Sequence, residues 1–297
     1  MRVNPDLTPD VLAAISRAMK QENTALNQIS TGKRVSRPSD DPLAASALVQ
    51  NQARSDRTDQ YVQNGKSAQS LLQMADSTLG LVVSSLTRAI SLGIEGASGT
   101  VSSDNQQQIA QEIEGIRDQV VQLANVSVNG RHVFAGTVIG PDPFTVDPTQ
   151  PSGVAYGGNS GTNKIEVADG RTIQINLPGD EVFQASGANV MDSLQKLIVA
   201  LKASDRTAIS DATADIRNAM EHVSLNRVTY GNAMSQLQSN DSFLQQEKLQ
   251  LKSEENDIAG IDMAEAAINL NNARNAHDAA LAAAAKVLPL SLLDYLK

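Results

Sequence analysis

Residues 29–46, ISTGKRVSRPSDDPLAAS, separate two segments that both have the apolar periodicity of long helices. Gly32 is a candidate C-cap of the first segment, because the left-handed residue that ends a helix is most often glycine. Asp41 precedes Pro42, and proline is favoured at the first position of a helix. The stretch is therefore expected to end one helix and begin the next.

The basic residues of this stretch have two interpretations. Lys33 and Arg34 follow the first helix at its negative end, where cations complement the helix dipole. Alternatively, these two side chains converge with Arg37 on a bound anion. We favour the first interpretation, because helix-capping rules already account for the change from basic to acidic residues.

Apolar stripes precede this stretch and recur near the other end of the chain, with the three- and four-residue steps of a coiled-coil seam. Neither stripe has a core of its own, so both are expected to need partners. The N-terminal stripe comprises Leu12, Ile15, Met19, Glu22, Leu26 and Ile29. The C-terminal stripe comprises Met263, Ala266, Leu270, Ala273, His277, Ala280, Ala284 and Val287.

Further helical stripes lie within residues 72–86, 109–123 and 216–251, and they are typical of a helical bundle. Between residues 131 and 187 the helical period disappears and Gly, Pro, Asp and Thr become frequent. There the segment KIEVADGRTIQINL, residues 164–177, alternates like two strands. We expect an odd-length loop with Gly170 at positive φ, because a two-residue turn would place the isoleucines of the two strands on opposite faces.

Composition narrows the function classes. The chain of 297 residues has no Cys, 3% aromatic residues and a net charge of -9. The low aromatic content favours thin helix-on-helix seams in an elongated protein. Non-specific nucleic-acid binding requires clustered Lys and Arg, so the acidic balance argues against it. No secretory h-region is readable near the N-terminus, and we expect no membrane contact.

Motifs that carry chemistry are not found. His132, His222 and His277 have no second His at the helical spacing of metal ligands. Gly65, Lys66 and Ser67 end like a phosphate loop, but Gln60 stands where the first Gly is required. We therefore expect neither an enzyme nor a cofactor, and a hydrolase finds no support.

Two blocks of sequence resemble the terminal signatures of the flagellin superfamily. The first is ISTGKRVSRPSDDPLAASALV, residues 29–49, and the second is IDMAEAAINLNNARNAHDAALAAAAKVLPLSLLDYL, residues 261–296. Within the superfamily, RPSDDP at 37–42 and NGRHVFAGTVIGPDPF at 129–144 are more similar to the hook-associated proteins of the hook–filament junction than to filament flagellins.

The resemblance implies a mainly α fold built from both ends of the chain. A terminal coiled-coil domain would comprise residues 1–45 and 258–297, and a long-helix bundle would comprise residues 46–135 and 188–257. Residues 136–187 would form a small β-rich surface insertion, without which we expect the bundle still to close. The connector between the two helical domains would comprise Gly32, Arg37, Pro38, Asp40, Asp41 and Pro42.

The resemblance also implies a structural adaptor that joins hook and filament. Its partners would be further copies of itself in a ring, a second hook-associated protein on the hook side, and flagellin on the filament side. A cytoplasmic chaperone would hold the C-terminal segment, and the flagellar type III apparatus would export the chain to the extracellular flagellum. The expected subunit contacts are Leu12, Ile15, Met19, Leu26, Ile29, Met263, Leu270, Leu281 and Leu288.

Two alternatives remain open at this point. The chain is a minor flagellin in the first, and in the second it is a binding module whose insertion recognises a carbohydrate or a host surface. Removing the insertion discriminates the second alternative, because a module would lose its ligand whereas an adaptor would still assemble.

Overall fold

The computed structural model describes residues 8–295 and the side chains of residues 9–286. The described chain is mainly helical with a small β-rich part, as the sequence predicts. The helices are α1 (Thr8–Thr31), α2 (Pro42–Gly96), α3 (Ser103–Ala124), α4 (Gly179–Phe183), α5 (Val190–Ala203), α6 (Arg206–Ala259) and α7 (Met263–Tyr295).

Contacts within the chain divide it into two compact units. Residues 1–57 and 246–297 form the first, called the terminal unit here, and residues 58–245 form the second, the central unit. Helices α2 and α6 therefore each contribute residues to both units. Whether residues 136–187 form a domain of their own stays a prediction.

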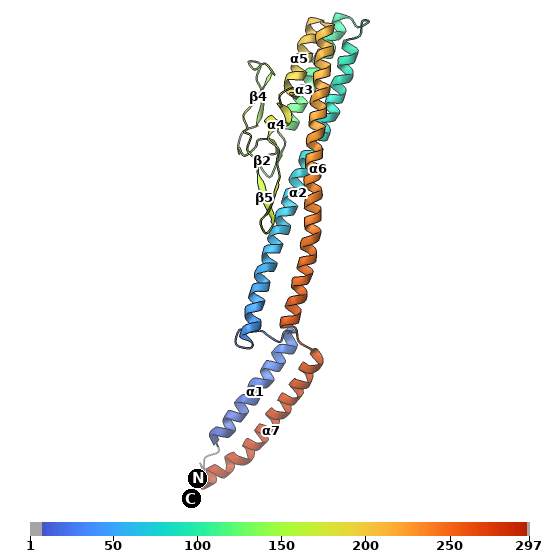
Figure 1. Cartoon of the computed structure of the whole chain (residues 1–297). Helices are drawn as coiled ribbons and strands as arrows, with labels where there is room; N and C mark the ends of the chain where they lie inside the picture. Colours follow the sequence, from blue (N-terminus) through green and yellow to red (C-terminus); the bar gives the residue numbers. More distant parts are fainter. Residues whose placement is uncertain (1–7, 296–297) are drawn as a thin grey trace. The chain divides into compact units, whose positions relative to one another are not determined.

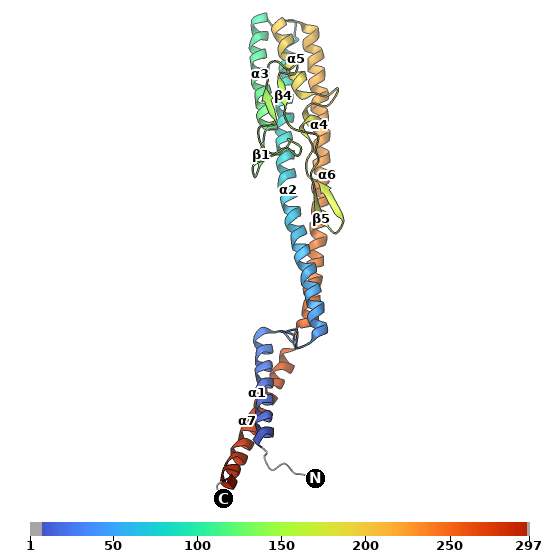
Figure 2. The same cartoon turned by 90° about the vertical axis from the view of Figure 1, so that its left-hand side faces the viewer.

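The terminal unit contains the two helices nearest the chain ends. Helices α1 and α7 lie side by side and run in opposite directions in both views (Figures 1 and 2). Their buried side chains are small: Ala18 and Ala25 on α1, and Ala266, Ala273 and Ala284 on α7. Small residues allow two helices to approach closely, but they bury little apolar area.

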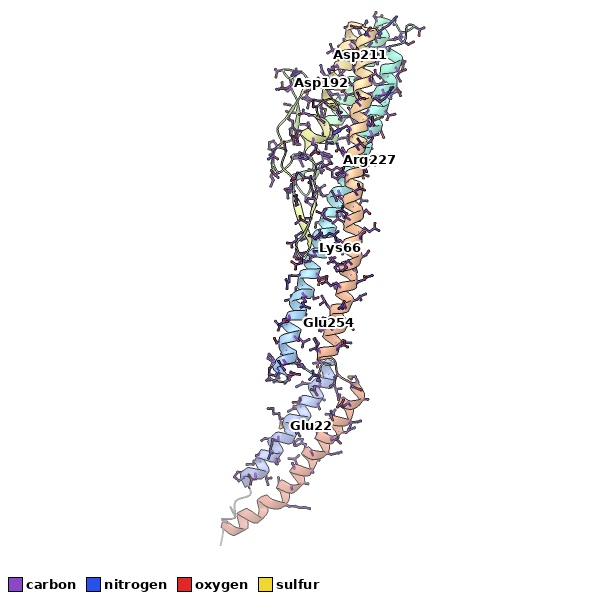
Figure 3. The ribbon with its side chains drawn as sticks, viewed as in Figure 1. Glu22, Lys66, Asp192, Asp211, Arg227 and Glu254 are labelled. Carbon is purple, nitrogen blue, oxygen red and sulfur yellow. The ribbon has the colours of Figure 1, made fainter. Side chains whose placement is uncertain are left out.

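The central unit is a bundle in which residues 58–96 of α2 and 206–245 of α6 pack with α3 and α5. Its helices bury the apolar faces that their periodicity predicts. Arg227, labelled in Figure 3, lies at a seam position of α6 and donates from Nε to Asp76 Oδ1 on α2 over 2.9 Å. Fully buried residues of the four helices include Leu79, Val82, Leu86, Ile113, Val120, Leu194, Leu197, Ile216 and Val223.

Three small antiparallel hairpins follow α3. Their strands are β1 (Ser127–Val128) with β2 (Arg131–His132), β3 (Phe144–Val146) with β4 (Val154–Tyr156), and β5 (Lys164–Ala168) with β6 (Arg171–Gln174). In Figure 2 they lie beside the helices of the central unit.

The third hairpin corrects the loop length expected from the sequence. Ala168 pairs with Arg171, so the turn has two residues, and Gly170 has the expected positive φ of 66°. Ile165 nevertheless pairs with Ile173, because the register shifts between Glu166 and Ala168. This bulge adds one residue to β5 and thereby puts the two isoleucines on one face.

The hairpin region shares its core with the bundle. Phe134 and Phe144 each contact the ring of Phe183 edge-on, with ring centroids 5.1 and 5.3 Å apart. These three rings belong to the same buried cluster as the helix residues. Side chains from the helices also hold hairpin backbone: Asn240 Nδ2 donates to Val167 O over 2.7 Å, and Leu177 N–H donates to the hydroxyl of Tyr230 over 3.0 Å.

Helix α2 is also apolar over part of its length. One window of 18 residues has a mean hydropathy of 1.4, and 39% of it is buried within the protein. Such a window fits a membrane span by length and composition, and it equally fits the core helix of a bundle. The buried side chains of α2, among them Leu72, Leu79 and Leu86, account for much of that apolar character.

Candidate assembly site

The connector between α1 and α2 begins and ends with helix caps. Gly32 has a φ of 67°, and its N–H donates to Gln28 O over 2.9 Å, which closes the last turn of α1. Helix α2 begins at Pro42, and Asp41 Oδ1 accepts from the N–H of Ala44 over 3.1 Å. Both caps have the geometry expected from the residue types.

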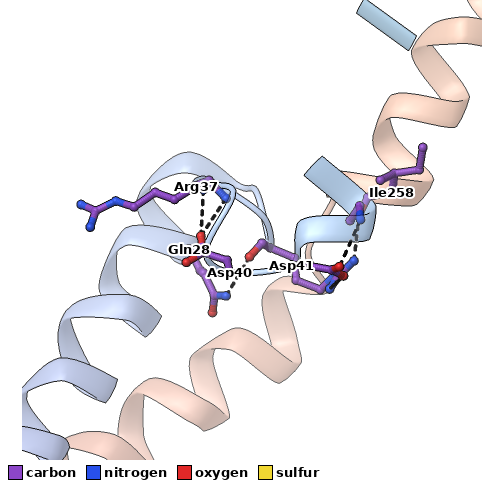
Figure 4. A network of polar contacts seen from close by, with 8 residues as sticks. Gln28, Arg37, Asp40, Asp41 and Ile258 are labelled. Atoms are coloured by element: carbon purple, nitrogen blue, oxygen red, sulfur yellow. Dashed lines mark hydrogen bonds and ion pairs between the residues drawn. The ribbon is translucent and has the colours of Figure 1, made fainter. Parts of the chain in front are cut away.

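A tight turn separates the two caps. Asp40 Oδ2 accepts from the backbone N–H groups of Ser36 and Arg37, over 3.1 and 2.9 Å. Pro38 lies inside this turn and restricts its backbone. The side chain of Arg37 points away from the network (Figure 4). Arg37 therefore contributes to the turn through its backbone.

Arg34 joins the connector to the end of α6. Its guanidinium donates to Asp41 Oδ2 over 3.2 Å and to the carbonyl of Ile258 over 3.0 Å (Figure 4). Its backbone N–H donates to Ala259 O over 2.6 Å. Arg34 thus complements the negative end of a helix, but the helix is α6 rather than α1 as the sequence suggested.

Lys33 likewise contacts the end of α6. Its Nζ lies 3.0 Å from Glu255 Oε1, and its backbone pairs with Gly260 in an isolated antiparallel bridge. Carboxylates therefore partner both Lys33 and Arg34, and Arg37 points elsewhere. The alternative in which the three cations converge on an anion is wrong.

Two carboxyl groups that contact the basic residues of the connector, Asp41 and Glu255 of α6, are held in their charged form. The N–H of Ala44 and the guanidinium of Arg34 lower the pKa of Asp41. Lys252 and Lys33 lower the pKa of Glu255. Each of these two carboxylates therefore lies beside a cation of the connector, Arg34 for Asp41 and Lys33 for Glu255.

The contact face of α1 differs in phase from the expected stripe. Ile15, Glu22 and Ile29 are half-buried, and the fully buried positions between them are Ala18 and Ala25. Sequence reasoning missed both alanines, although they keep the three- and four-residue steps with Glu22 and Ile29. Alanine carries little hydrophobic signal, so the larger leucines dominated the pattern.

The large apolar residues of the predicted stripe that do not face α7 form a second apolar line on α1. Leu12, Met19 and Leu26 are spaced by seven residues and are 55%, 53% and 47% exposed. Seven residues make nearly two turns of a helix, so the three side chains lie on one face. We call these three residues the α1 stripe. In the described chain about half of the surface of each of these side chains is exposed.

The predicted contact residues of α7 also divide into two groups. Leu270 is half-buried against α1, whereas Met263 and Leu281 are 52% and 46% exposed. Leu288 lies outside the residues whose side chains the structure describes. Helix α7 therefore also presents large apolar side chains that α1 does not cover.

The described residues show no grouping of three or more His, Asp or Glu suited to a metal ion. His132 Nδ1 lies 2.8 Å from Asn125 O, and His222 Nε2 lies 2.8 Å from Glu181 O. His277 contacts Glu22, with Nδ1 2.8 Å from Oε2. Each histidine is thus held by a backbone or seam partner.

Comparisons with known proteins match the helical regions at both ends of the chain. The N-terminal helical region of bacterial flagellin matches residues 10–138, and the C-terminal helical region matches residues 213–296. The structure of the flagellar junction protein FlgL from Legionella pneumophila is similar with a TM-score of 0.60, 14% identity, and coverage of 72% of this chain and 99% of that chain.

Curated relatives come from two groups. A Listeria monocytogenes flagellin is 24% identical, over 89% of this chain and 88% of its own length. Flagellar hook-associated protein 3 of Escherichia coli is 30% identical, over 79% of this chain and 80% of its own length. The chain belongs to the family of flagellar hook-associated protein 3.

Proposed function

We propose that this chain is a structural subunit of the bacterial flagellum that forms the junction between hook and filament. The observation that carries the proposal is the exposed α1 stripe, on a pair of terminal helices in a chain of this family. Large apolar side chains at heptad spacing are the usual means by which helices associate. The function is mechanical and requires no cofactor.

The proposed partners are those that a subunit between hook and filament would contact. Copies of the chain associate through Leu12, Met19 and Leu26 on α1 and through Met263 and Leu281 on α7. The hook side contacts a second hook-associated protein, and the filament side contacts flagellin. The connector, from Gly32 to Pro42, orients the terminal helices for these contacts.

Export belongs to the same proposal. A structural subunit of the external flagellum must leave the cytoplasm, and we assign this step to the flagellar type III apparatus, with a cytoplasmic chaperone on the C-terminal segment. A chain without Cys passes such a route without forming disulfides. Its final location is extracellular.

The minor-flagellin alternative has weaker support, because the identity to the Listeria flagellin is 24% and the identity to hook-associated protein 3 is 30%. A binding role for the insertion has no observation that favours it over a structural role. Of its three aromatic residues, Phe144 and Phe183 are in the core, and Tyr156 is half-buried against Phe144.

The proposal is tested with Leu26→Asp in the source bacterium. The change forfeits about 1.5–3 kcal/mol of apolar burial in each assembled subunit and places a carboxylate in the contact. Cells are expected to make hooks, to lack filaments and to release flagellin into the medium. Because Leu26 is 47% exposed in the free chain, the variant should still fold.

Asn27→Asp is the matched control, since it adds the same charge at the neighbouring exposed position outside the α1 stripe. Control cells should swim normally. Normal swimming with Leu26→Asp, or filaments of ordinary length after deletion of this gene alone, would contradict the junction role and favour the minor flagellin.

A further inference from the structure

The sequence contains two Asn-Gly pairs, Asn64–Gly65 and Asn129–Gly130. In such a pair the backbone nitrogen of the glycine can attack the side-chain amide of the asparagine, because glycine has no side chain that hinders the approach. The sequence alone gives both pairs the same reactivity. The structure, however, places the first pair inside a long helix and the second in the turn of a short hairpin.

Asn64 and Gly65 lie within α2, where both the backbone and the asparagine side chain are held. An α-helix binds the N–H of Gly65 to the carbonyl group four residues earlier and fixes the backbone dihedrals, which keeps this nitrogen away from the Asn64 amide. The Nδ2 of Asn64 donates to Glu166 O over 2.8 Å, and its Oδ1 accepts from Gln60 Nε2 over 3.0 Å. Attack at Asn64 therefore requires α2 to open and both hydrogen bonds to break.

Asn129 and Gly130 form the turn between β1 and β2, which Figures 2 and 1 label beside the helices of the central unit. Both residues are exposed, and Asn129 has a φ of 53°. Among the described residues, none forms a hydrogen bond with the Asn129 side chain. A hairpin with two paired positions opens easily, because few contacts hold it. Attack at Asn129 therefore requires only a local change in an exposed turn.

We propose that Asn129 is a site of non-enzymatic conversion to aspartate and isoaspartate, and that α2 protects Asn64 from the same reaction. A base removes the proton from Gly130 N, and this nitrogen forms a bond to Asn129 Cγ. The bond between Cγ and Nδ2 breaks, and ammonia leaves with one added proton. Water then opens the cyclic succinimide: breaking the new bond to Cγ gives aspartate, and breaking the bond to the main-chain carbonyl carbon gives isoaspartate.

Isoaspartate adds one carbon atom to the main chain of the turn. A two-residue turn supports strand pairing only with a defined backbone, so β1 and β2 should separate. Directly beyond the hairpin, the N–H of Val133 donates to Val126 O over 3.0 Å. Val133 and Phe134 are then buried in the core of the central unit. The modification therefore loosens the segment that carries Phe134 into this core.

The reaction needs only the free chain and water, so it is measured without a flagellum and independently of the junction role. The full-length chain is kept at neutral pH for several weeks, both in its native state and in urea, which unfolds the surroundings of both pairs. Mass spectrometry of proteolytic peptides quantifies conversion at Asn64 and at Asn129. Asn129→Gly is the matched variant, because it removes the amide and keeps a residue that accepts positive φ.

In the native chain Asn129 should convert at least about tenfold faster than Asn64, because Asn64 reacts only in the small fraction of molecules in which α2 is open. In urea the two rates should agree within about threefold, since neither pair keeps its native surroundings. Hydrogen-exchange protection at the amide of Val133 should decrease in the native chain as isoaspartate accumulates. Asn129→Gly, kept for the same time, should retain this protection.

Three results would overturn the proposal. The first is equal conversion of the two asparagines in the native chain, which would mean that the turn protects its amide as well as the helix does. The second is a difference between them that persists in urea, because neighbouring residues rather than the fold would then set the rates. The third is unchanged protection of Val133 in a chain rich in isoaspartate, which would show that the hairpin tolerates the longer turn. A failed junction role alters none of these measurements.

Discussion

Asp41 makes two contacts, of which the sequence suggests only the first. Its Oδ1 caps α2 through the N–H of Ala44, while its Oδ2 receives the guanidinium of Arg34, which also holds the end of α6. The capping role was predictable from Asp41 and Pro42 alone. The long-range role was not, because the sequence does not tell which helix end Arg34 reaches.

The connector should weaken in acid. Asp41 and Glu255 have pKa values lowered from their ordinary values of 3.8 and 4.5, so their contribution to stability is complete above those values. It is lost as the pH falls below them and the carboxylates become protonated. Hydrogen-exchange protection at the amides of Ala44 and Arg34, corrected for the intrinsic rate, should decrease from about pH 5.5 to about pH 3.

Asp41→Asn provides the control, because asparagine still caps a helix but does not titrate. Protection at Ala44 in this variant should be nearly independent of pH over the same range. If the native chain and Asp41→Asn show the same acid sensitivity, the connector does not depend on the charge of Asp41.

Tyr230 should be important for the central unit through one hydroxyl group. The side chain is 2% exposed, burial raises its pKa, and its oxygen accepts from the N–H of Leu177. Tyr230→Phe leaves that buried N–H without its partner and should lower the free energy of unfolding by about 1–3 kcal/mol. Urea unfolding followed by circular dichroism measures the change.

Ser239→Ala removes an exposed hydroxyl from the same helix and should change stability by less than about 0.5 kcal/mol. Equal stability of Tyr230→Phe and the native chain would mean that water or another group replaces the hydroxyl at Leu177.

At the scale of elements, the sequence predicts the type of each long helix better than the face it buries. The three- and four-residue steps of α1 fit the set with Leu12, Met19 and Leu26, and they fit equally the set with Ala18 and Ala25. The second set faces α7, because small side chains let two helices approach closely. The larger residues remain exposed and are thus available to neighbouring chains.

The third hairpin was also only partly predictable from the sequence. The alternation of β5 and β6 and the positive φ of Gly170 follow from the residue types. The bulge at Val167 does not, because it is fixed by tertiary contacts: Val167 is fully buried, and its carbonyl accepts from Asn240. An odd-length loop and a bulge in β5 both place Ile165 and Ile173 on the same face, and the sequence alone does not tell which of the two occurs.

Replacing residues 136–187 by a flexible linker should destabilise the central unit, contrary to the expectation that the bundle closes without them. The replaced segment contributes Phe144, Val167 and Phe183 to the shared core. Removing one buried Phe typically costs about 3–5 kcal/mol, so losing several such residues should abolish the cooperative unfolding transition. Differential scanning calorimetry measures this transition.

Deleting residues 148–151 from the exposed tip of the second hairpin is the control, and it should leave the transition nearly unchanged. A native-like transition after the full replacement would show that the helices close on themselves.

The two units differ in how they obtain stability. The central unit buries large aliphatic and aromatic side chains within residues 58–245, whereas the described contact between α1 and α7 buries mainly alanines. Apolar stabilisation is proportional to buried area, so the terminal unit gains less from its internal contact. Its large side chains Leu12, Met19 and Leu26 instead remain partly exposed in the single chain.

A chain limited to residues 58–245 should therefore fold by itself. It contains the complete buried cluster of the central unit, including the three phenylalanines, the hydrogen bond that Tyr230 accepts from Leu177 and the one that Asn240 donates to Val167. Its unfolding midpoint in urea should lie close to that of the main transition of the full-length chain, because the contacts that determine this transition are the same. Brief proteolysis of the full-length chain should accordingly leave a fragment that begins near Thr58 and ends near Gln245. The full-length chain carrying Leu26→Asp should give the same fragment at the same rate, since Leu26 contributes nothing to the central unit and is exposed in the free subunit. An unfolded 58–245 chain would mean that the terminal unit supports the central unit, and the effect of Leu26→Asp on filaments would then have to be separated from a loss of folding.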